Sequence, residues 1–336
     1  LLKIKSAQNL RDYLLYKKYI SKIVNFNANK IFDGIDTYSM IIELTNSNEE
    51  ILYKSLPNNQ DSLSYLYVNN WNVLSKNNIT HDSINLIDKR TEELANNVQK
   101  QIFSLDISTG IATQKDKLFL IDDANLIDDK YMIKLFEGKK YLIEKESVVR
   151  VYKGSGQEKG NLKYSYIIYP YLIADNKAIL KSNEYLSKNE PMTYKYFIES
   201  RKELSKRSGI NEYDENWYRY GRTQSLNRFD HKILFPTNSI KPNFNLILDK
   251  ALFFNGYAIY GLKEINLSDK ELKALEIILN SKLVEIFMLN TSYFISSGYV
   301  SYQKKYIEKV TIPILSDDKI DKLLELNEAN DLFELN

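Results

Sequence analysis

The chain has 336 residues, which is long enough for two domains with separate cores. Of these residues 43% are hydrophobic and 27% charged, a composition typical of globular proteins. It contains no cysteine and only two histidines, which excludes a disulfide framework and a zinc site built from these residues alone. Its net charge of +2 excludes a surface that is basic throughout, and no apolar run reaches the roughly 20 residues that a membrane-spanning helix needs.

The first 46 residues are predicted to form one helix and two strands. Leu10, Tyr13 and Leu14 recur at helical spacing, whereas the two following segments are rich in residues that favour strands. The helix is expected at residues 8–18, and the strands at residues 20–26 and 37–44. So short a segment cannot close a core, and we expect it to belong to a larger α/β sheet whose earlier strands lie outside the chain.

Residues 47–62 are predicted to be a linker, because they are polar and contain Pro57-Asn58-Asn59. Residues 51–56 within this segment could also form a short strand. Residues 63–336 are predicted to form a second domain of irregular α+β architecture, without internal repeats or regular βαβ alternation. Its strands are expected at residues 65–68, 118–122, 141–144, 147–152 and 164–169, and its helices at residues 88–104, 193–206 and 268–288.

No motif for self-sufficient catalysis is found in the sequence. It has no glycine-rich dinucleotide fingerprint, no Walker A motif, no nucleophile elbow and no cluster of metal ligands, so no metal is expected. The paired carboxylates Asp122-Asp123 and Asp128-Asp129 lie in short polar connections, where turn or helix-cap roles are typical. The start of the chain shows neither a secretion signal nor an initiator Met, and a cytoplasmic setting without membrane contact is expected.

The strongest local signal is the run from Trp217 to Gln224, followed by Asn227-Arg228. Arginine can read guanine through a forked pair of hydrogen bonds, and the amides of Asn and Gln can read adenine in the same way. Candidate DNA-binding residues here are Arg219, Arg222, Gln224, Asn227 and Arg228. The alternative, a Trp/Tyr core strand with arginines on its solvent face, is weighed equally.

Two further polar segments are candidates for DNA contacts. The first, around Gly110, runs into a predicted strand and could present backbone N–H groups to DNA. The second, around Gly298, is crowded with aromatic, amide and basic residues that suit phosphate contacts, although ordinary helix–loop packing explains it nearly as well. The candidates are Thr113, Gln114 and Lys115 in the first segment, and Tyr299, Tyr302, Gln303 and Lys304 in the second.

Taken in order, these segments resemble the gamma-class N6-adenine DNA methyltransferases with a TaqI-like specificity domain, the Eco57I-type group. The similarity covers nearly the whole chain, and the ordered set of motifs is its specific part. Within this group, the Lys-, Asn- and Tyr-rich composition suggests a clostridial orphan methyltransferase of the CamA type. The matching landmarks are residues 1–6, 10–15, 24–26, 30–38, 110–113, 119, 217–218, 221–222, 232–236, 279–283, 297–298 and 302–303.

The resemblance implies methyl transfer from S-adenosylmethionine to the exocyclic amine of an adenine flipped out of duplex DNA. Phe32 matches the aromatic residue that stacks on the flipped base in that family. The family's cofactor motif and its Asn/Asp-Pro-Pro-Tyr/Phe motif do not occur in this sequence, and Gln114 stands where a second glycine is common. We therefore expect S-adenosylmethionine to be bound mainly by an N-terminal part outside the chain, and the chain to be inactive alone.

The leading hypothesis is a monomeric protein in which residues 1–46 end a Rossmann-like methyltransferase domain and residues 63–336 recognise the target sequence in duplex DNA. The partner would be the missing N-terminal catalytic domain. An alternative is a stand-alone, non-catalytic DNA specificity subunit of a restriction-modification system. A third reading, an RNA-binding or protein-binding module, follows from the 26 tyrosines, since tyrosine joins a stacking face to a polar tip.

Overall fold

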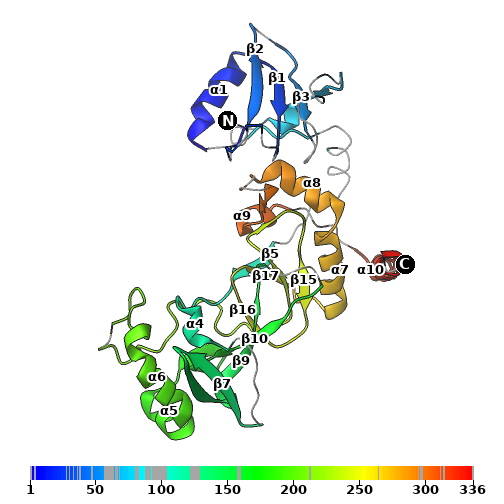
Figure 1. Ribbon diagram of the computed structural model, residues 1–336. Coiled ribbons are helices and arrows are strands. Elements are labelled where there is room, and N and C mark those ends of the chain that lie inside the picture. The colour runs from blue at the N-terminus through cyan, green and yellow to red at the C-terminus, as the bar shows by residue number, and fades with distance from the viewer. Residues whose placement is uncertain are drawn as a thin grey trace. The chain divides into compact units, whose positions relative to one another are not determined.

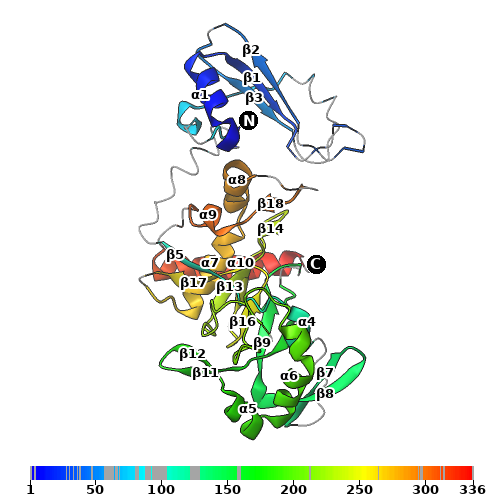
Figure 2. The same ribbon diagram turned by 90° about the vertical axis from the view of Figure 1, so that its left-hand side faces the viewer.

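Two compact units make up the computed structural model (Figures 1 and 2). The first consists of Leu1–Ser104, Asn238–Pro242 and Ile277–Asn336, and the second of Leu105–Thr237 and Asn243–Glu276. The structure describes all residues except 1, 4, 28, 30, 33, 36, 38, 47, 57–63, 65–66, 68, 80–82, 88–91, 93–103, 122–128, 157–159, 212, 264, 294, 296–297, 311, 313–314 and 335–336.

The first unit contains a four-stranded sheet in the order β2-β1-β3-β4. The central strand β1 pairs antiparallel with β2 and parallel with β3. Its core is built from Leu14, Ile20, Ile23, Tyr53 and Ile84. Bounds in this part are η1 Lys5–Ala7, α1 Gln8–Tyr16, β1 Ile20–Asn25, β2 Met40–Leu44, β3 Leu52–Ser55, β4 Asn72–Val73 and η2 Lys76–Asn78.

The first unit also contains helices from the C-terminal part of the chain. Ser281 begins α8 by accepting a hydrogen bond from the Val284 N–H, and Lys3 Nζ donates to the carbonyl of Ser292 just after this helix at 2.8 Å. The bounds are α7 Asp269–Leu279, which begins in the second unit, α8 Lys282–Thr291, α9 Lys304–Ile307, α10 Asp317–Glu334, and the paired strands β14 Asn238–Ser239 and β18 Val300–Ser301.

The second unit has two four-stranded sheets, β16-β9-β10-β6 and β15-β13-β17-β5. Two separate hairpins, β7–β8 and β11–β12, project from the lower part of Figure 2. The strands are β5 Leu105–Thr109, β6 Leu120–Ile121, β7 Tyr131–Phe136, β8 Lys139–Glu144, β9 Val148–Lys153, β10 Tyr164–Ile168, β11 Tyr171–Ala174, β12 Lys177–Leu180, β13 Lys232–Phe235, β15 Asn245–Ile247, β16 Leu252–Phe254 and β17 Tyr257–Leu262.

Aromatic packing fills the main core of the second unit. Phe119, Phe197 and Tyr220 are buried there together with Trp217 and Tyr218. The carboxylate of Glu144 accepts hydrogen bonds from the Met192 and Thr193 N–H groups at 2.7 and 2.8 Å, satisfying donors in the first turn of α6. The helical elements are α4 Asp116–Phe119, η3 Lys145–Ser147, α5 Asn183–Asn189 and α6 Pro191–Leu204.

The expected mixture of helices and strands is confirmed, and the strands form several separate sheets. Two predicted elements were wrong in detail. The helix expected at residues 268–288 is two helices, because Ser281 caps a new helix after α7, and residues 118–122 begin as the end of α4 before the short strand β6. The strand expected at 65–68 and the helix expected at 88–104 lie almost wholly outside the described residues, as do residues 57–62 of the predicted linker.

The segment predicted as a linker contributes a strand, since β3 pairs with β1 from residue 52 onward. The strand expected at 37–44 is β2, an edge strand on which Ile41 is 50% and Leu44 53% exposed. Among the described residues, no helix is both long enough and apolar enough to cross a membrane.

Candidate nucleic-acid interface

Two of the loops singled out in the sequence lie against each other in the second unit. The 110–115 loop connects β5 to α4, and the 219–225 loop follows the buried aromatic pair Trp217-Tyr218. Their backbones join through the Gly221 N–H to the Thr113 carbonyl at 3.2 Å and the Arg222 N–H to the Ala112 carbonyl at 3.1 Å. We call this pair the joined loops.

A buried arginine, Arg207, holds the two joined loops together by hydrogen bonds to their backbone carbonyls. Arg207 is 3% exposed and donates to the carbonyls of Leu204, Thr113, Arg219 and Trp217 at 2.5 to 3.2 Å. It forms no ion pair with a carboxylate in the described part of the chain, and burial lowers the pKa of its guanidinium to about 10. Its planar fork of donors suits this task, because one side chain can reach carbonyls on both loops.

Two glycines allow close packing at the joined loops, Gly110 against strand β16 and Gly221 against the facing loop. A Cβ atom on Gly110 would lie 2.3 Å from the Phe253 carbonyl oxygen, and the neighbouring Ile111 N–H donates to that same oxygen at 2.9 Å. A Cβ atom on Gly221 would lie 2.3 Å from the side-chain amide of Gln114. Gly110 therefore permits a backbone contact, whereas Gly221 leaves room for one polar side chain.

Three polar side chains of the joined loops are exposed to solvent and have no partner within the described part of the chain. They are Gln114, Arg222 and Thr223. None of the three side chains forms a hydrogen bond or ion pair with another described residue. Gln114 has a φ of +62°, an uncommon conformation for a residue with a side chain, and its side-chain amide lies against Gly221.

Two other predicted residues of the 110–115 loop have structural contacts. Thr113 is 1% exposed, and its hydroxyl donates to the Asp116 carboxylate and accepts from the Lys115 N–H at 3.1 Å. Lys115 Nζ lies 3.7 Å from the Glu203 carboxylate. These contacts order the turn into α4.

The predicted residues after Arg222 also hold the protein together. The amide nitrogen of Gln224 donates to the Thr109 hydroxyl and the Gly110 carbonyl, both at 2.9 Å. Arg228 forms a forked pair of hydrogen bonds with Asp106 at 2.6 and 3.2 Å, with its guanidinium 3.5 Å from the centre of the Tyr260 ring. Asn227 donates to the Asn176 carbonyl at 2.5 Å.

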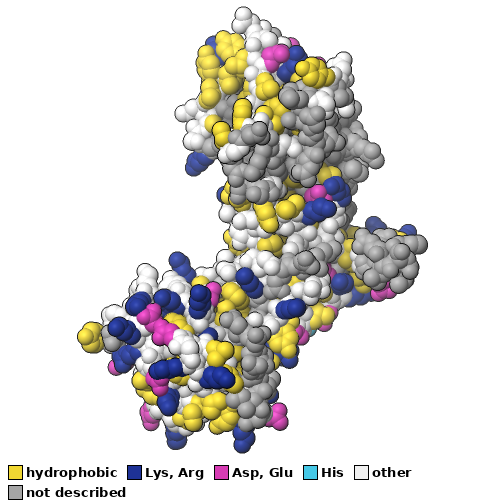
Figure 3. All heavy atoms as spheres, viewed as in Figure 1, with side chains coloured by type: hydrophobic (Ala, Val, Ile, Leu, Met, Phe, Trp, Pro, Cys, Tyr) yellow, Lys and Arg dark blue, Asp and Glu magenta, His cyan; other side chains and the backbone are white. Residues whose placement is uncertain are grey.

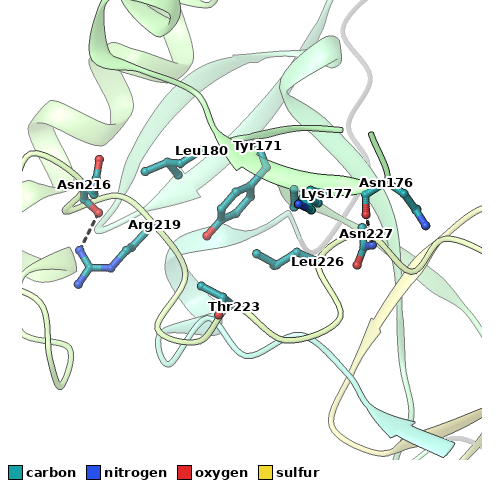
Figure 4. Close-up of a pocket in the computed structure, with 10 residues that line it drawn as sticks. Tyr171, Asn176, Lys177, Leu180, Asn216, Arg219, Thr223, Leu226 and Asn227 are labelled. Carbon is teal, nitrogen blue, oxygen red and sulfur yellow. Dashed lines mark hydrogen bonds between the residues drawn. The ribbon is translucent and has the colours of Figure 1, made fainter. Parts of the chain in front are cut away.

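A cleft of about 350 Å³ opens beside the joined loops (Figure 4). The β11–β12 hairpin supplies one wall with Tyr171 and Lys177, and the segment after α6 supplies the other with Arg219 and Thr223. Arg219 is engaged by the Gly209 carbonyl at 2.8 Å and by Asp214 at 3.5 Å. Its guanidinium therefore forms a fixed part of the cleft wall.

The remaining predicted residues belong to the first unit. Phe32 is 55% exposed, and its carbonyl accepts from the Ile35 N–H at 3.3 Å. Tyr299 is 42% exposed, whereas Tyr302 is 1% exposed and its burial raises the pKa of its hydroxyl. The carbonyl of Gln303 accepts from the Tyr306 N–H at the start of α9, where Lys304 is half-buried.

Sequence reasoning did not select Arg207 or the β11–β12 hairpin. Arg207 lies in a polar run, Ser205-Lys206-Arg207-Ser208, that has the composition of a solvated surface. The sequence does contain a signal for this hairpin: Asp175 and Asn176, two residues that tolerate positive φ, separate two strand-like runs.

Sequence comparison identifies a homologous restriction-modification enzyme. The chain is 22% identical over 351 aligned residues to the type II restriction enzyme and methyltransferase RM.Eco57I of Escherichia coli. The alignment covers 94% of this chain but 34% of that protein, so the chain spans about a third of the length of its relative. No protein-family model matches the chain.

Solved structures show where the fold recurs. The type IIL restriction-modification enzyme MmeI, solved in complex with DNA, aligns with a TM-score of 0.54 and 10% identity over 98% of this chain and 40% of that one. The type IIG restriction endonuclease BpuSI aligns over 96% of this chain and 40% of that one, with 12% identity and a TM-score of 0.43. The chain thus shares a fold with part of MmeI.

Proposed function

We propose that this chain recognises a specific sequence in duplex DNA, and that this recognition directs N6-methylation of an adenine by the whole protein. One observation carries the recognition part. The side chains of Gln114 and Arg222 are exposed on the joined loops and have no partner among the described residues, while direct hydrogen bonds and Arg207 hold the loop backbones next to them.

The chemistry of these two side chains suits base edges. A guanidinium donates two hydrogen bonds to O6 and N7 of guanine, and a side-chain amide pairs with N6 and N7 of adenine. Each such pair contributes about 1–3 kcal/mol of discrimination against the wrong base. Because the loops are already ordered, less conformational entropy is lost when they bind DNA.

We assign a structural role, not base reading, to Gln224, Asn227 and Arg228. Their side chains hold the joined loops and the neighbouring segments through the contacts described above. For Gln224 to read adenine, its amide nitrogen would first have to leave Thr109 and Gly110. Gln114 needs no such rearrangement, and we therefore assign it the adenine-reading position.

The methylation part rests on the relatives and on the first unit. RM.Eco57I is described as both a restriction enzyme and a methyltransferase, and MmeI was solved with DNA. Hydrophobic side chains gather over α1 and β2 (Figure 3), where Tyr16 is 79% and Leu10 54% exposed. Exposed apolar surface of this kind suits cover by a further part of a catalytic domain.

In the proposed reaction, Phe32 supplies a stacking surface for the flipped adenine, which offsets part of the few kcal/mol lost on unstacking. Its exposed ring is consistent with that role. S-adenosylmethionine would supply the methyl group, and we assign none of the described residues to its binding.

Base-by-base affinity measurements on the full-length protein test the recognition step. Arg222→Ala and Gln114→Ala are each expected to relax preference at one base pair by about tenfold. Lys188→Ala, which removes an exposed cation from α5, serves as the matched control and should leave preference unchanged. Wild-type preference in both loop variants would refute the assignment of the joined loops.

The stacking step is tested by Phe32→Ala and Phe32→Trp in the full-length enzyme. We expect Phe32→Ala to slow adenine methylation at saturating DNA and Phe32→Trp to retain most of the rate, because the larger ring still stacks. If Phe32→Ala methylated adenine at the wild-type rate, Phe32 would not be the residue that stacks on the flipped base.

A further inference from the structure

The β11–β12 hairpin stands apart from the larger sheets of the second unit. Among the strands that the structure describes, these two pair with each other alone, from Tyr171 opposite Leu180 to Ala174 opposite Lys177. Leu172 and Ile179 face each other across the strands and are 41% and 53% exposed. In Figure 2 the β11–β12 hairpin projects from the second unit.

The base of this hairpin is firmly anchored. Lys181, which follows β12, forms a buried ion pair with Glu190 at 2.5 Å, and both side chains are less than 5% exposed. The Tyr218 hydroxyl donates to the Lys181 carbonyl at 2.6 Å, and the Tyr171 hydroxyl accepts from the Tyr220 N–H at 2.7 Å. The hairpin is therefore fixed to the same aromatic core that supports the joined loops.

The tip of the hairpin is equally well defined. Asp175 and Asn176 form a two-residue turn with φ values of +47° and +57°, the pattern of a type I′ turn. The Asn176 carbonyl accepts from Asn227, which ties the tip to the segment after the joined loops. The side chains of Asp175, Asn176 and Lys177 form no hydrogen bond or ion pair with another described residue.

We propose that the β11–β12 hairpin is a second specificity element, which enters the major groove of the bound duplex and reads base edges with Asp175, Asn176 and Lys177. This inference rests on the proposed DNA recognition. The major groove of B-form DNA is about 12 Å wide and admits a two-stranded β-ribbon. The ribbon is anchored at its base, and the Asn227 hydrogen bond holds only the backbone of its tip, so the exposed side chains of Asp175, Asn176 and Lys177 stay free to contact base edges.

The tip has the chemistry for reading bases. A carboxylate accepts a hydrogen bond from the cytosine amine, an amide pairs with adenine, and an ammonium donates to guanine. The exposed Leu172 and Ile179 can contact thymine methyl groups, which lie in the same groove. Lys177 supplies a cation that offsets the charge of Asp175 near the phosphates.

The test uses the full-length protein and duplexes selected from a randomised library, in which each base pair of the selected site is then varied. The double variant Asp175→Gly/Asn176→Gly retains the turn, because glycine readily adopts positive φ. We expect it to lose about tenfold or more of the preference at one or two base pairs that Arg222→Ala does not affect. Asp175→Asn should change, rather than abolish, the preference at one of these pairs.

The other hairpin of the unit provides the control. The β7–β8 turn has Glu137 at φ +48° and Gly138 at φ +76°, so Glu137→Gly also removes an acid from a two-residue turn. This variant should keep wild-type preference. If the β11–β12 variants unfold like wild type and show wild-type preference while Arg222→Ala does not, the hairpin proposal is overturned and the joined loops stand. If no protein shows sequence preference, the proposed function itself fails.

Discussion

Gly110 and Gly221 show how two residues of one type can have different roles at one site. Gly110 faces backbone and Gly221 faces a flexible side chain. We predict that Gly110→Ala lowers the free energy of unfolding by about 2–4 kcal/mol, because a carbonyl and its strand must move. Gly221→Ala should cost less than about 1 kcal/mol but displace the Gln114 amide, and so weaken preference at the base pair that Gln114→Ala affects.

Chemical denaturation and base-by-base affinity, measured on the same two proteins, separate these effects. Gly138→Ala is a control for the change of residue alone, since nothing lies within 4 Å of a Cβ atom there, although its positive φ adds backbone strain. Equal stability losses for the two loop glycines would contradict the prediction.

The buried Lys232 makes the free energy of unfolding depend on pH. It is 1% exposed, its Nζ donates to the Ala251 carbonyl at 2.7 Å, and burial lowers its pKa from the ordinary lysine value of 10.5 to about 8. Below pH 8 both folded and unfolded states hold the proton. Between pH 8 and 10.5 the unfolded state holds more protons, so this residue makes the protein more stable as pH rises.

We therefore predict that the difference in unfolding free energy between wild type and Lys232→Met shifts in favour of wild type by about 1–2 kcal/mol from pH 8 to pH 10. Denaturant titrations at several pH values measure it, and titrating tyrosines affect both proteins alike. A difference that is flat or falls over this range would show that Lys232 keeps an ordinary pKa.

At the scale of elements, Arg207 links four carbonyls: one at the end of α6, two in the joined loops and that of Trp217 just before them. Arg207→Lys keeps the charge but cannot reach this set, because an ammonium is a single compact donor group. We predict a loss of about 2–4 kcal/mol in unfolding free energy and faster amide hydrogen exchange in residues 110–115 and 219–225. Arg222→Lys, at an exposed position, should change neither quantity.

The sequence predicted those elements whose pattern is local. Strands β9 and β10 and helix α6 lie within two residues of their expected positions, since alternation and helical spacing are properties of adjacent residues. The break between α7 and α8 was missed because a long Leu/Ile stripe continues across it. The short helix α4 begins at Asp116, which accepts a hydrogen bond from Thr113, within a segment that also has strand-like composition.

The segments of the candidate interface could be selected from the sequence, but which of their side chains are buried and which are exposed could not. Composition alone could not tell that Trp217, Tyr218 and Tyr220 are core residues while Arg222 points outward. Nor could it tell that Gln224 is bonded to Gly110, more than 100 positions earlier, since such contacts arise only when the chain has folded. The roles of the predicted residues in DNA binding stay predictions.

For the chain as a whole, the near-neutral net charge of +2 limits its own non-specific attraction to polyanions. On the face shown in Figure 3, Lys and Arg side chains are interspersed with Asp and Glu. Under the proposed function, affinity for a duplex therefore comes largely from shape and from base-edge contacts made by the joined loops and the β11–β12 hairpin. This requirement separates duplex DNA from duplex RNA, because A-form RNA has a deep and narrow major groove that side chains cannot read.

We predict that the full-length protein binds a duplex RNA of the selected sequence about 100-fold or more weakly than the DNA duplex at roughly 0.15 M salt. Competition binding over a range of salt concentrations measures both affinities and their salt slopes. A DNA duplex of scrambled sequence controls for phosphate attraction, and it should bind with an affinity close to that of the RNA. Equal binding of the matched DNA and RNA would instead favour an RNA-binding module, because a reader of B-form major-groove edges cannot treat the two duplexes alike.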